Sequence, residues 1–199
     1  KEPRIISIPT IRDKVALAAC HLFLQETYRD VIEEPLLHTI VGDITQCVQS
    51  GLYTGYVKVD ITKFYASIDH DILLKKVRQK IRKKEALVLL ENAITTQTIA
   101  RGTTAPQKEK TNLGVPEGLS ISNILADIYL TDLKTAVCNK YDIKFFRYVD
   151  DILILCDVNQ AESIKLFVVD VLHREFALSA NTDKTVAGKL EDGVPFLGY

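Results

Sequence analysis

Two adjacent aspartates, Asp150 and Asp151, lie between two runs of strand-forming residues, 143–148 and 152–156. Neighbouring side chains of a straight strand point to opposite faces, so both carboxylates can project from one sheet edge only in the turn of a tight hairpin. Two like charges side by side disfavour each other's ionisation, and a divalent cation with oxygen ligands removes that cost. The pattern predicts a hairpin turn that binds magnesium or manganese, with a solvated Asp-Asp turn as the alternative.

A third carboxylate, Asp60, ends a second β-branched run at residues 56–61, where its apolar neighbours favour burial. If this strand lies beside the hairpin, Asp60 joins Asp150 and Asp151 in one acidic cluster. Three carboxylates can hold two metal ions roughly 3.5–4 Å apart, the arrangement that binds the attacking and leaving oxygens in phosphoryl transfer. The sequence therefore predicts a site for two Mg²⁺ ions, in which Mn²⁺ can substitute.

Six short motifs, in family order along the chain, resemble those of reverse transcriptases. They are residues 4–14, similar to the fingers motif of bacterial members; 59–65, to the first catalytic motif; 114–123, to the loop and helix that hold nucleotide and template; 148–151, to the catalytic hairpin; 178–185, to the next motif; and 196–199, to the start of the primer grip. The resemblance implies an RNA-directed DNA polymerase whose partners are an RNA template, a DNA or RNA primer and deoxynucleoside triphosphates.

The same resemblance implies an α+β fold, the right-hand palm of polymerases, with part of the fingers and no thumb. The expected segments are partial fingers at 1–55, the first part of the palm at 56–84, a connection at 85–113, and the second part of the palm up to the primer grip at 114–199. The chain contains no methionine and ends where a thumb should begin, so we expect a fingers–palm fragment of a longer protein.

Hydrophobic periodicity and turn residues predict the individual elements. Strands are expected at 4–8, 56–61, 143–148 and 152–156, and helices at 12–29, 43–50, 70–90, 120–139 and 159–177. Pro35 and Gly42 are expected to interrupt the chain before residue 43. Asp69 is expected to cap the helix that follows it, and Asn159 to cap the last helix. The order strand–helix–helix–strand–strand–helix predicts an antiparallel sheet backed by helices.

The resemblance assigns catalytic roles to four side chains and one carbonyl. Asp60, Asp150 and Asp151 are expected to bind metal, and Ile61 to offer its backbone carbonyl. Lys184 matches a family lysine proposed to protonate the pyrophosphate leaving group, and general acid help of this kind is worth ~10²–10⁴-fold. The alternative for Lys184 is a solvent-exposed lysine in a turn.

A second set of residues is expected to bind the nucleotide. Tyr65 matches the family aromatic beneath the incoming sugar, where a bulky ring clashes with a 2′-hydroxyl and so selects deoxynucleotides. Arg4 and Arg12 are candidates for the triphosphate, because guanidinium groups match phosphate oxygens bidentately. Arg12 is alternatively an ion-pair partner of Asp13.

The segment Gly114–Asn123 is expected to place Pro116, Glu117 and Gly118 against the nucleotide. It departs from the family at two positions, since glutamine is usual at 117 and many relatives have proline at 123. An ionised carboxylate cannot donate a hydrogen bond and repels phosphate, so we expect altered nucleotide positioning, fidelity or substrate use.

The primer is expected to contact four residues: Tyr148, Phe196, Leu197 and Gly198. Residues 10–14 and 126–130 resemble bacterial enzymes, among them intron maturases, retron and phage-defence types. Val149 and Glu117 differ from the maturase pattern, which favours alanine and glutamine there, and this favours a lineage associated with antiviral defence or another unclassified bacterial lineage.

Composition limits the remaining possibilities. The net charge of −1 gives no global sign of nucleic-acid binding, although residues 75–84 hold seven basic side chains and no acid. The four scattered cysteines favour a reducing cytoplasm over a disulfide or zinc scaffold. No run is long and apolar enough for a membrane span, which needs ~20 residues. The alternatives are an RNA-synthesising or template-independent nucleotide polymerase, and a non-catalytic nucleic-acid-binding module.

Overall fold

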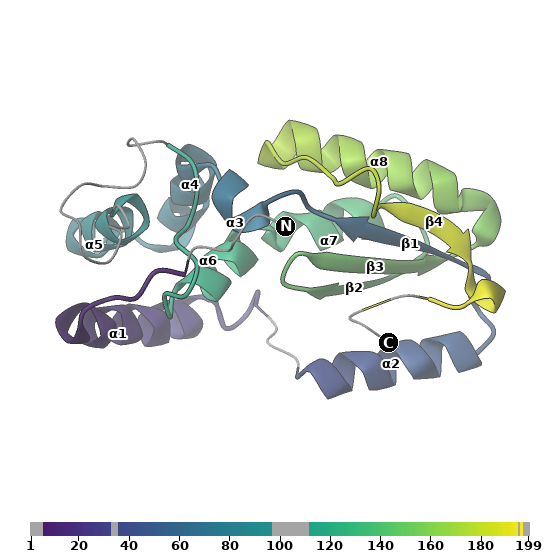
Figure 1. Cartoon of the computed structure of the whole chain (residues 1–199), viewed down its shortest axis with the longest axis horizontal. Helices are drawn as coiled ribbons and strands as arrows, with labels where there is room; N and C mark the ends of the chain where they lie inside the picture. The colour runs from purple at the N-terminus through teal and green to yellow at the C-terminus, as the bar shows by residue number, and fades with distance from the viewer. Residues whose placement is uncertain (1–5, 33–35, 97–111, 195, 197–199) are drawn as a thin grey trace. The chain divides into compact units, whose positions relative to one another are not determined.

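A computed structural model describes residues 6–32, 36–96, 112–194 and 196 of the chain. Its elements are labelled in Figure 1. The chain divides into two compact units. The helical unit comprises residues 1–32 and 65–129, and the sheet unit comprises residues 33–64 and 130–199. The functional segments predicted from the sequence follow different boundaries and stay a prediction.

The sheet unit is built on four strands within the described residues: β1 (Gly55–Asp60), β2 (Lys144–Tyr148), β3 (Asp151–Cys156) and β4 (Val186–Lys189). The strand order is β2-β3-β1-β4, and every neighbouring pair is antiparallel. The three predicted strands β1, β2 and β3 are confirmed to within one residue. The sequence did not predict β4, because this short strand is largely solvent-accessible and contains a glycine.

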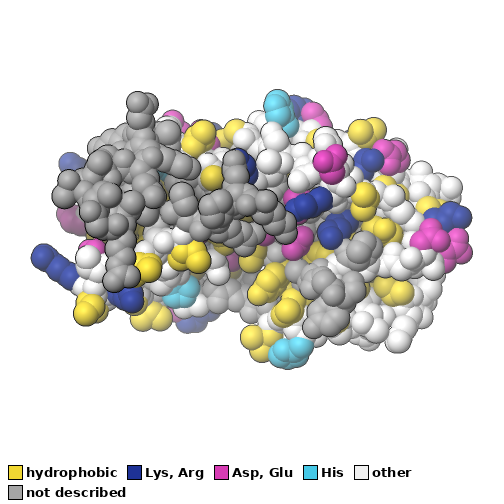
Figure 2. Space-filling view, in the orientation of Figure 1, with side chains coloured by type: hydrophobic (Ala, Val, Ile, Leu, Met, Phe, Trp, Pro, Cys, Tyr) yellow, Lys and Arg dark blue, Asp and Glu magenta, His cyan; other side chains and the backbone are white. Residues whose placement is uncertain are grey.

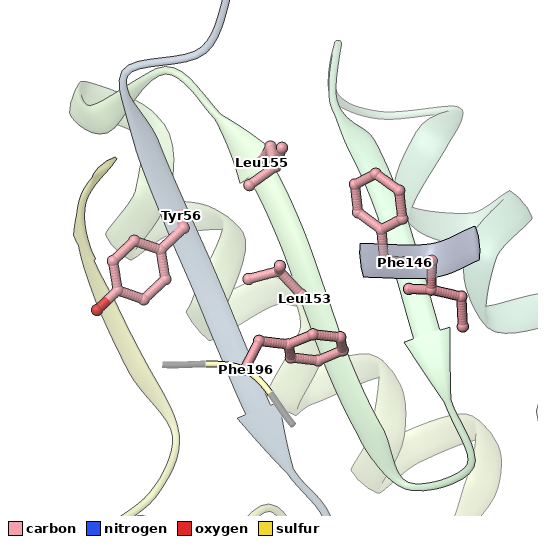
Figure 3. Packing of buried hydrophobic residues seen from close by; sticks show 6 residues of the cluster. Tyr56, Phe146, Leu153, Leu155 and Phe196 are labelled. Carbon is pink, nitrogen blue, oxygen red and sulfur yellow. The ribbon is translucent and has the colours of Figure 1, made fainter. Parts of the chain in front are cut away.

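Helices cover both faces of this sheet. α7 (Thr131–Cys138) and α8 (Val158–Phe176) pack against each other; α8 also contacts β1 and β4, and α7 contacts β2. α2 (Leu37–Gln49) contacts β2. The cluster in Figure 3 joins Tyr56, Phe146, Leu153, Leu155 and Phe196 with Ile40 of α2. The strand residues that alternate with this cluster, such as Val57 and Ile154, are also completely buried.

The helical unit contains α1 (Ile11–Tyr28), α4 (His70–Lys80), α5 (Lys84–Thr95) and α6 (Ser122–Tyr129). The short helix α3 (Phe64–Ser67) crosses the boundary between the units, and Phe64 is buried. α6 is nearly all buried and packs against α1 and α4. Asp69 caps α4 as predicted, because its Oδ1 accepts a hydrogen bond from the Ile72 N–H at 3.0 Å.

Several predicted boundaries were wrong. The helix at 70–90 is two helices, because Ile81 adopts extended backbone angles and turns inward. The helix at 120–139 breaks at Leu130, which lies at the division between the units. α2 starts at Leu37 and continues through Gly42. The N-cap of α8 is Asp157, whose Oδ1 accepts from the Asn159 N–H at 2.8 Å.

At the N-terminus, the described residues 6–8 of the predicted strand at 4–8 are not in a strand. The rest of that prediction lies outside the described residues. Among the helices that the structure describes, none combines the length and the apolar character needed to cross a bilayer.

Candidate active site

Asp60 and Asp151 face each other across two neighbouring strands. Asp60 is the last residue of β1, Asp151 is the first of β3, and the antiparallel register makes them direct partners. Directly opposed residues of an antiparallel pair project from the same face, with Cβ atoms roughly 4.5–5.5 Å apart. The structure therefore brings two of the three predicted metal-binding carboxylates together.

The third carboxylate, Asp150, lies in the two-residue turn between β2 and β3. The turn is unusual because Val149, its first residue, has φ 56°. A β-branched residue is strained there, at a cost of order 1–3 kcal/mol, and such strain is common at functional sites. The Arg147 guanidinium donates from Nη1 to the Val149 carbonyl at 3.0 Å and so supports the turn. The sequence did not predict this role of Arg147, because it depends on the backbone conformation of the turn.

The carboxylates act on one another electrostatically. Burial raises the pKa of Asp151 above its ordinary value, and the negative charges of Asp150 and Asp60 raise it further. Lys58 and Lys184 act in the opposite direction without cancelling the rise in this pKa. Burial and like charge together disfavour the ionised form of Asp151, and a bound cation would stabilise that form.

Lys184 reaches the same edge from the segment that follows α8. Its ammonium Nζ lies 3.2 Å from Asp60 Oδ1 and 3.5 Å from Oδ2. The Lys184 side chain is 64% exposed and that of Asp60 only 18%, so an exposed lysine pairs with a largely buried carboxylate. The predicted proton donor is therefore in contact with the predicted metal ligand.

Two hydrogen bonds tie the segment that carries Lys184 to the end of β1. The Asn181 N–H donates to the Asp60 carbonyl at 2.8 Å. The Asp60 N–H donates to Thr185 Oγ1 at 3.3 Å, and Thr185 is buried. Thr185 is a second supporting residue that the sequence did not reveal, because its hydroxyl acts on backbone 125 positions away.

The donor set of this edge has the right chemistry for Mg²⁺, which prefers carboxylate oxygens. The Lys184 ammonium on Asp60 shows that the edge already accepts a positive charge. Within the described residues, however, no group of three or more His, Cys, Asp or Glu side chains is arranged to hold a metal ion. The residues fit a hard cation, while the three-carboxylate cluster itself stays a prediction.

The nucleotide residues predicted around Tyr65 lie in the helical unit and form a second connected group. The Tyr65 carbonyl accepts from the Val115 N–H at 2.8 Å, and the Ile68 carbonyl accepts from the Gly114 N–H at 2.8 Å. The Tyr65 hydroxyl donates to Asn123 Oδ1 at 2.7 Å. Tyr65 is thereby joined through main chain and side chain to the segment that contains Pro116, Glu117 and Gly118.

Hydrogen bonds to backbone carbonyls and a close approach of the main chain at Gly118 hold the turn Gly114–Gly118 in place. Gly118 has φ 95°, and a Cβ there would come within 2.7 Å of Ile6 Cγ2 and 3.0 Å of the Ser7 carbonyl oxygen. The Ser7 N–H donates to the Glu117 carbonyl at 2.8 Å, and the Ser122 hydroxyl donates to the Pro116 carbonyl at 2.6 Å. The structure thus groups Pro116, Glu117 and Gly118 in one tightly constrained turn.

The remaining predicted residues are more dispersed. Arg12 is exposed in the first turn of α1, where the Thr10 side chain caps the helix and bonds Asp13. Tyr148 is 39% exposed and is the register partner of Asp151. Phe196 is 4% exposed in the core cluster (Figure 3), so its side chain is a packing residue. Arg4, Leu197 and Gly198 lie outside the described residues.

Charge is mixed over the surface in view. Figure 2 shows basic and acidic side chains interspersed on one face. Leu73 and Val77 of α4 and the C-cap residue Ile81 are buried, whereas most lysines and arginines of the basic stretch 75–84 are exposed. One of them, Lys80, forms an ion pair with Asp30. The stretch is therefore a solvated helix face in part neutralised by its neighbours.

The whole chain, residues 1–199, matches the family described as "Reverse transcriptase (RNA-dependent DNA polymerase)". It belongs to the reverse transcriptase family. Protein YkfC of Escherichia coli K12 is 24% identical over 241 residues, covering 98% of this chain and 62% of YkfC. The group II intron-encoded protein LtrA of Lactococcus lactis is 28% identical over 155 residues, covering 74% of this chain and 25% of LtrA. The chain thus spans less than two thirds of the length of each of these relatives.

Solved structures show the same fold. Telomerase from Candida albicans, in complex with a fragment of telomeric RNA, superposes with a TM-score of 0.64 at 19% identity, covering 93% of this chain and 35% of that one. A truncated apo telomerase from Candida tropicalis gives a TM-score of 0.60 at 16% identity, covering 92% and 42%. With the antiparallel sheet, this confirms the predicted α+β polymerase palm.

Proposed function

We propose that this reverse transcriptase chain is the core of an RNA-directed DNA polymerase, which adds deoxynucleotides to a primer 3′-end. Family membership supports a nucleotidyltransferase, and the observation that carries the proposal is the cross-strand pair Asp60–Asp151 with Lys184 bound to Asp60. An acidic pair with one exposed lysine at the end of a buried sheet is suited to phosphoryl transfer, where charge must be neutralised at the reacting oxygens.

Asp60, Asp150 and Asp151 would hold the divalent ions, with the Ile61 carbonyl as a further ligand. When bound there, two Mg²⁺ ions, or Mn²⁺ in their place, would lower the pKa of the primer 3′-hydroxyl and would neutralise charge on the triphosphate. Lys184 holds a proton at Nζ beside Asp60, and in the proposed reaction it gives this proton to the departing pyrophosphate. Strand register and the Arg147-supported turn keep the carboxylates in place.

Tyr65 of α3 and the turn Gly114–Gly118 bonded to it, together called the Tyr65 turn, would bind the incoming nucleotide. Tyr65 lies beneath the sugar and excludes a 2′-hydroxyl, and Pro116, Glu117 and Gly118 contact the base pair. Arg12 and Arg4 bind the triphosphate, and Tyr148, Leu197 and Gly198 contact the primer, while the Phe196 side chain packs in the core. Two hydrogen bonds support the role of Tyr65. The bond from Val115 fixes its main chain, and the bond to Asn123 fixes its ring beside the segment that carries Pro116, Glu117 and Gly118.

The partners follow from the same proposal: an RNA template, a DNA or RNA primer and deoxynucleoside triphosphates. The four cysteines, all in the described part of the chain, are unpaired, which supports a reducing cytoplasm. Likeness to the intron-encoded protein LtrA favours an intron-related lineage. Association with antiviral defence stays a prediction that rests on Val149 and Glu117.

Primer extension by the full natural protein tests the proposal. An RNA template, a labelled primer, Mg²⁺ and either deoxynucleotides or ribonucleotides are supplied, with the double variant Asp150→Ala, Asp151→Ala as the comparison. We expect template-dependent DNA that the folded double variant fails to make. Product from ribonucleotides alone, or without template, would instead identify one of the other polymerase classes. Nucleic-acid binding without any product would identify a non-catalytic module.

A further inference from the structure

The hydrogen bond between Tyr65 and Asn123 involves a position where this chain departs from its family. We propose that Asn123 is a positioning residue for Tyr65, and that it thereby sets how strongly the protein rejects ribonucleotides. The inference rests on the proposed function, since it assumes that Tyr65 lies beneath the incoming sugar. It adds a specificity determinant that does not itself touch the substrate.

The main chain around Tyr65 is fixed independently of Asn123. The Tyr65 carbonyl accepts from Val115, and three residues later the Ile68 carbonyl accepts from Gly114, both at 2.8 Å. A Cβ at Gly114 would lie 3.4 Å from the Ala66 carbonyl oxygen, so the two segments are in close contact. With the backbone held, the direction of the Tyr65 ring depends on rotation about its side-chain bonds.

Asn123 is mounted on a rigid element. It is exposed in the first turn of α6, between Ser122 and Ile124, which are 2% and 1% exposed. The Ser122 hydroxyl donates to the Pro116 carbonyl at 2.6 Å and fixes the start of this helix. The acceptor Asn123 Oδ1 therefore occupies a defined position, 2.7 Å from the Tyr65 hydroxyl. Both partners belong to the helical unit.

A steric gate rejects a 2′-hydroxyl only if its ring does not tilt away from it. The bond to Asn123 holds the far end of the ring and opposes such a tilt. Proline, which many relatives have at this position, offers no side-chain acceptor. One net hydrogen bond corresponds to about threefold to tenfold in an equilibrium, and we expect Asn123 to change nucleotide discrimination by that factor.

The test compares kcat/KM for a deoxynucleotide and for the matching ribonucleotide, and takes their ratio as the measure of discrimination. The variants are Asn123→Ala, Tyr65→Phe and the double variant; Asn123→Asp retains an acceptor oxygen at the same place. Asn92→Ala removes a matched exposed asparagine from α5 in the same unit. Circular dichroism and thermal unfolding establish that each variant is folded.

We expect Asn123→Ala and Tyr65→Phe each to lower the ratio about threefold to tenfold, chiefly through a smaller KM for the ribonucleotide. The double variant should lose no more than either single variant, because both remove the same bond. Asn123→Asp should keep the ratio, since its added charge repels both triphosphates alike, and Asn92→Ala should leave it unchanged.

Two results would overturn the inference while leaving the proposed function intact: an unchanged ratio in Asn123→Ala, or losses that add in the double variant. A wild-type protein that incorporates no nucleotide on any template would overturn the proposed function, and this inference with it. The two failures are therefore distinguishable in one set of reactions.

Discussion

The carboxylate edge of the sheet unit and the Tyr65 turn of the helical unit are built in contrasting ways. Asp60 and Asp151 are placed by the register of two strands whose other residues are largely buried. Tyr65 and Gly118 are placed by individual hydrogen bonds and by glycine backbone angles. A register fixes every residue of a strand at once. A turn of this kind depends on each contact separately, so it tolerates fewer substitutions.

The two regions are also constrained by different interactions. At the carboxylate edge like charges lie opposite one another, and a counter-charge such as Lys184 or a metal ion relieves the repulsion. In the Tyr65 turn the constraint is one of space, since a methyl group at Gly118 would meet the backbone of Ser7. Substitutions should therefore act through charge in the first region and through shape in the second.

The largest effect is expected from Asp60→Asn. This change keeps the size of the side chain and removes the charge that pairs with Lys184 and is proposed to bind a metal ion, so polymerisation should fall by more than about a hundredfold. Single-turnover primer extension measures the loss. Asp142→Asn, an exposed acid in the same unit, is the control and should retain full activity. Near-normal DNA synthesis by folded Asp60→Asn would contradict the metal-dependent mechanism.

Two substitutions of Lys184 distinguish proton donation by its ammonium group from the ion pair that it forms with Asp60. Lys184→Ala should lower the chemical rate by about a hundredfold if the ammonium donates a proton to the leaving group. Lys184→Arg keeps a positive charge on Asp60, but a guanidinium does not release its proton, so the rate should stay low. Single-turnover rates against pH provide the measurement. Full recovery in the arginine variant would show that only the ion pair matters.

Tyr65→Ala tests the shape of the turn. Removing the ring removes the proposed clash with a 2′-hydroxyl, so the preference for deoxynucleotides should fall by about tenfold to a hundredfold. Competition between the two nucleotide types in primer extension measures this preference. Phe64 is the neighbouring aromatic and is 2% exposed, so Phe64→Ala should destabilise the fold instead of changing sugar selection. An unchanged preference in Tyr65→Ala would remove this residue from the proposed site.

How far the sequence predicted the structure follows the same division. Strands β1 and β3 were correctly predicted, because each is a short run of apolar and β-branched residues of the kind found in buried strands. The pairing of Lys184 with Asp60 was not predicted from spacing, since the residues are 124 positions apart and only the resemblance indicated a shared site. The helix breaks at Ile81 and Leu130 were missed because tertiary burial, which periodicity does not report, decides them.

Two glycine substitutions compare the stability of the Gly118 turn in the helical unit with that of α2 in the sheet unit. Gly118→Ala should destabilise the protein by about 1–3 kcal/mol, because alanine is strained at φ 95° and its Cβ would approach Ile6 and Ser7. Gly42→Ala is the matched control. This glycine lies inside α2 with open space around its Cα, so alanine should stabilise the protein by about 0.5–1 kcal/mol. Urea unfolding measures both. Equal stability of the two variants would contradict a steric constraint that is present at Gly118 and absent at Gly42.

The smallest effect concerns Asp151 in the metal-free protein. Because its pKa is raised in the folded state, the native protein holds this proton more readily than the unfolded chain does. Stability should therefore fall as pH rises from the ordinary pKa of an aspartate through the raised pKa, and the ionised carboxylate should cost stability above that window.

Asp151→Asn removes this cost. In the presence of a chelator the variant should be slightly more stable than the wild type at neutral pH. The difference should vanish below the ordinary pKa, where the wild-type carboxyl is protonated in both states. Urea unfolding across the pH range measures the change, with Asp142→Asn as the exposed control. Added Mg²⁺ should then stabilise the wild type more than Asp151→Asn, because the charge that is costly in the metal-free sheet edge is the charge that binds the ion. A variant less stable than the wild type at neutral pH without metal would mean that packing, and not charge, governs this end of the sheet.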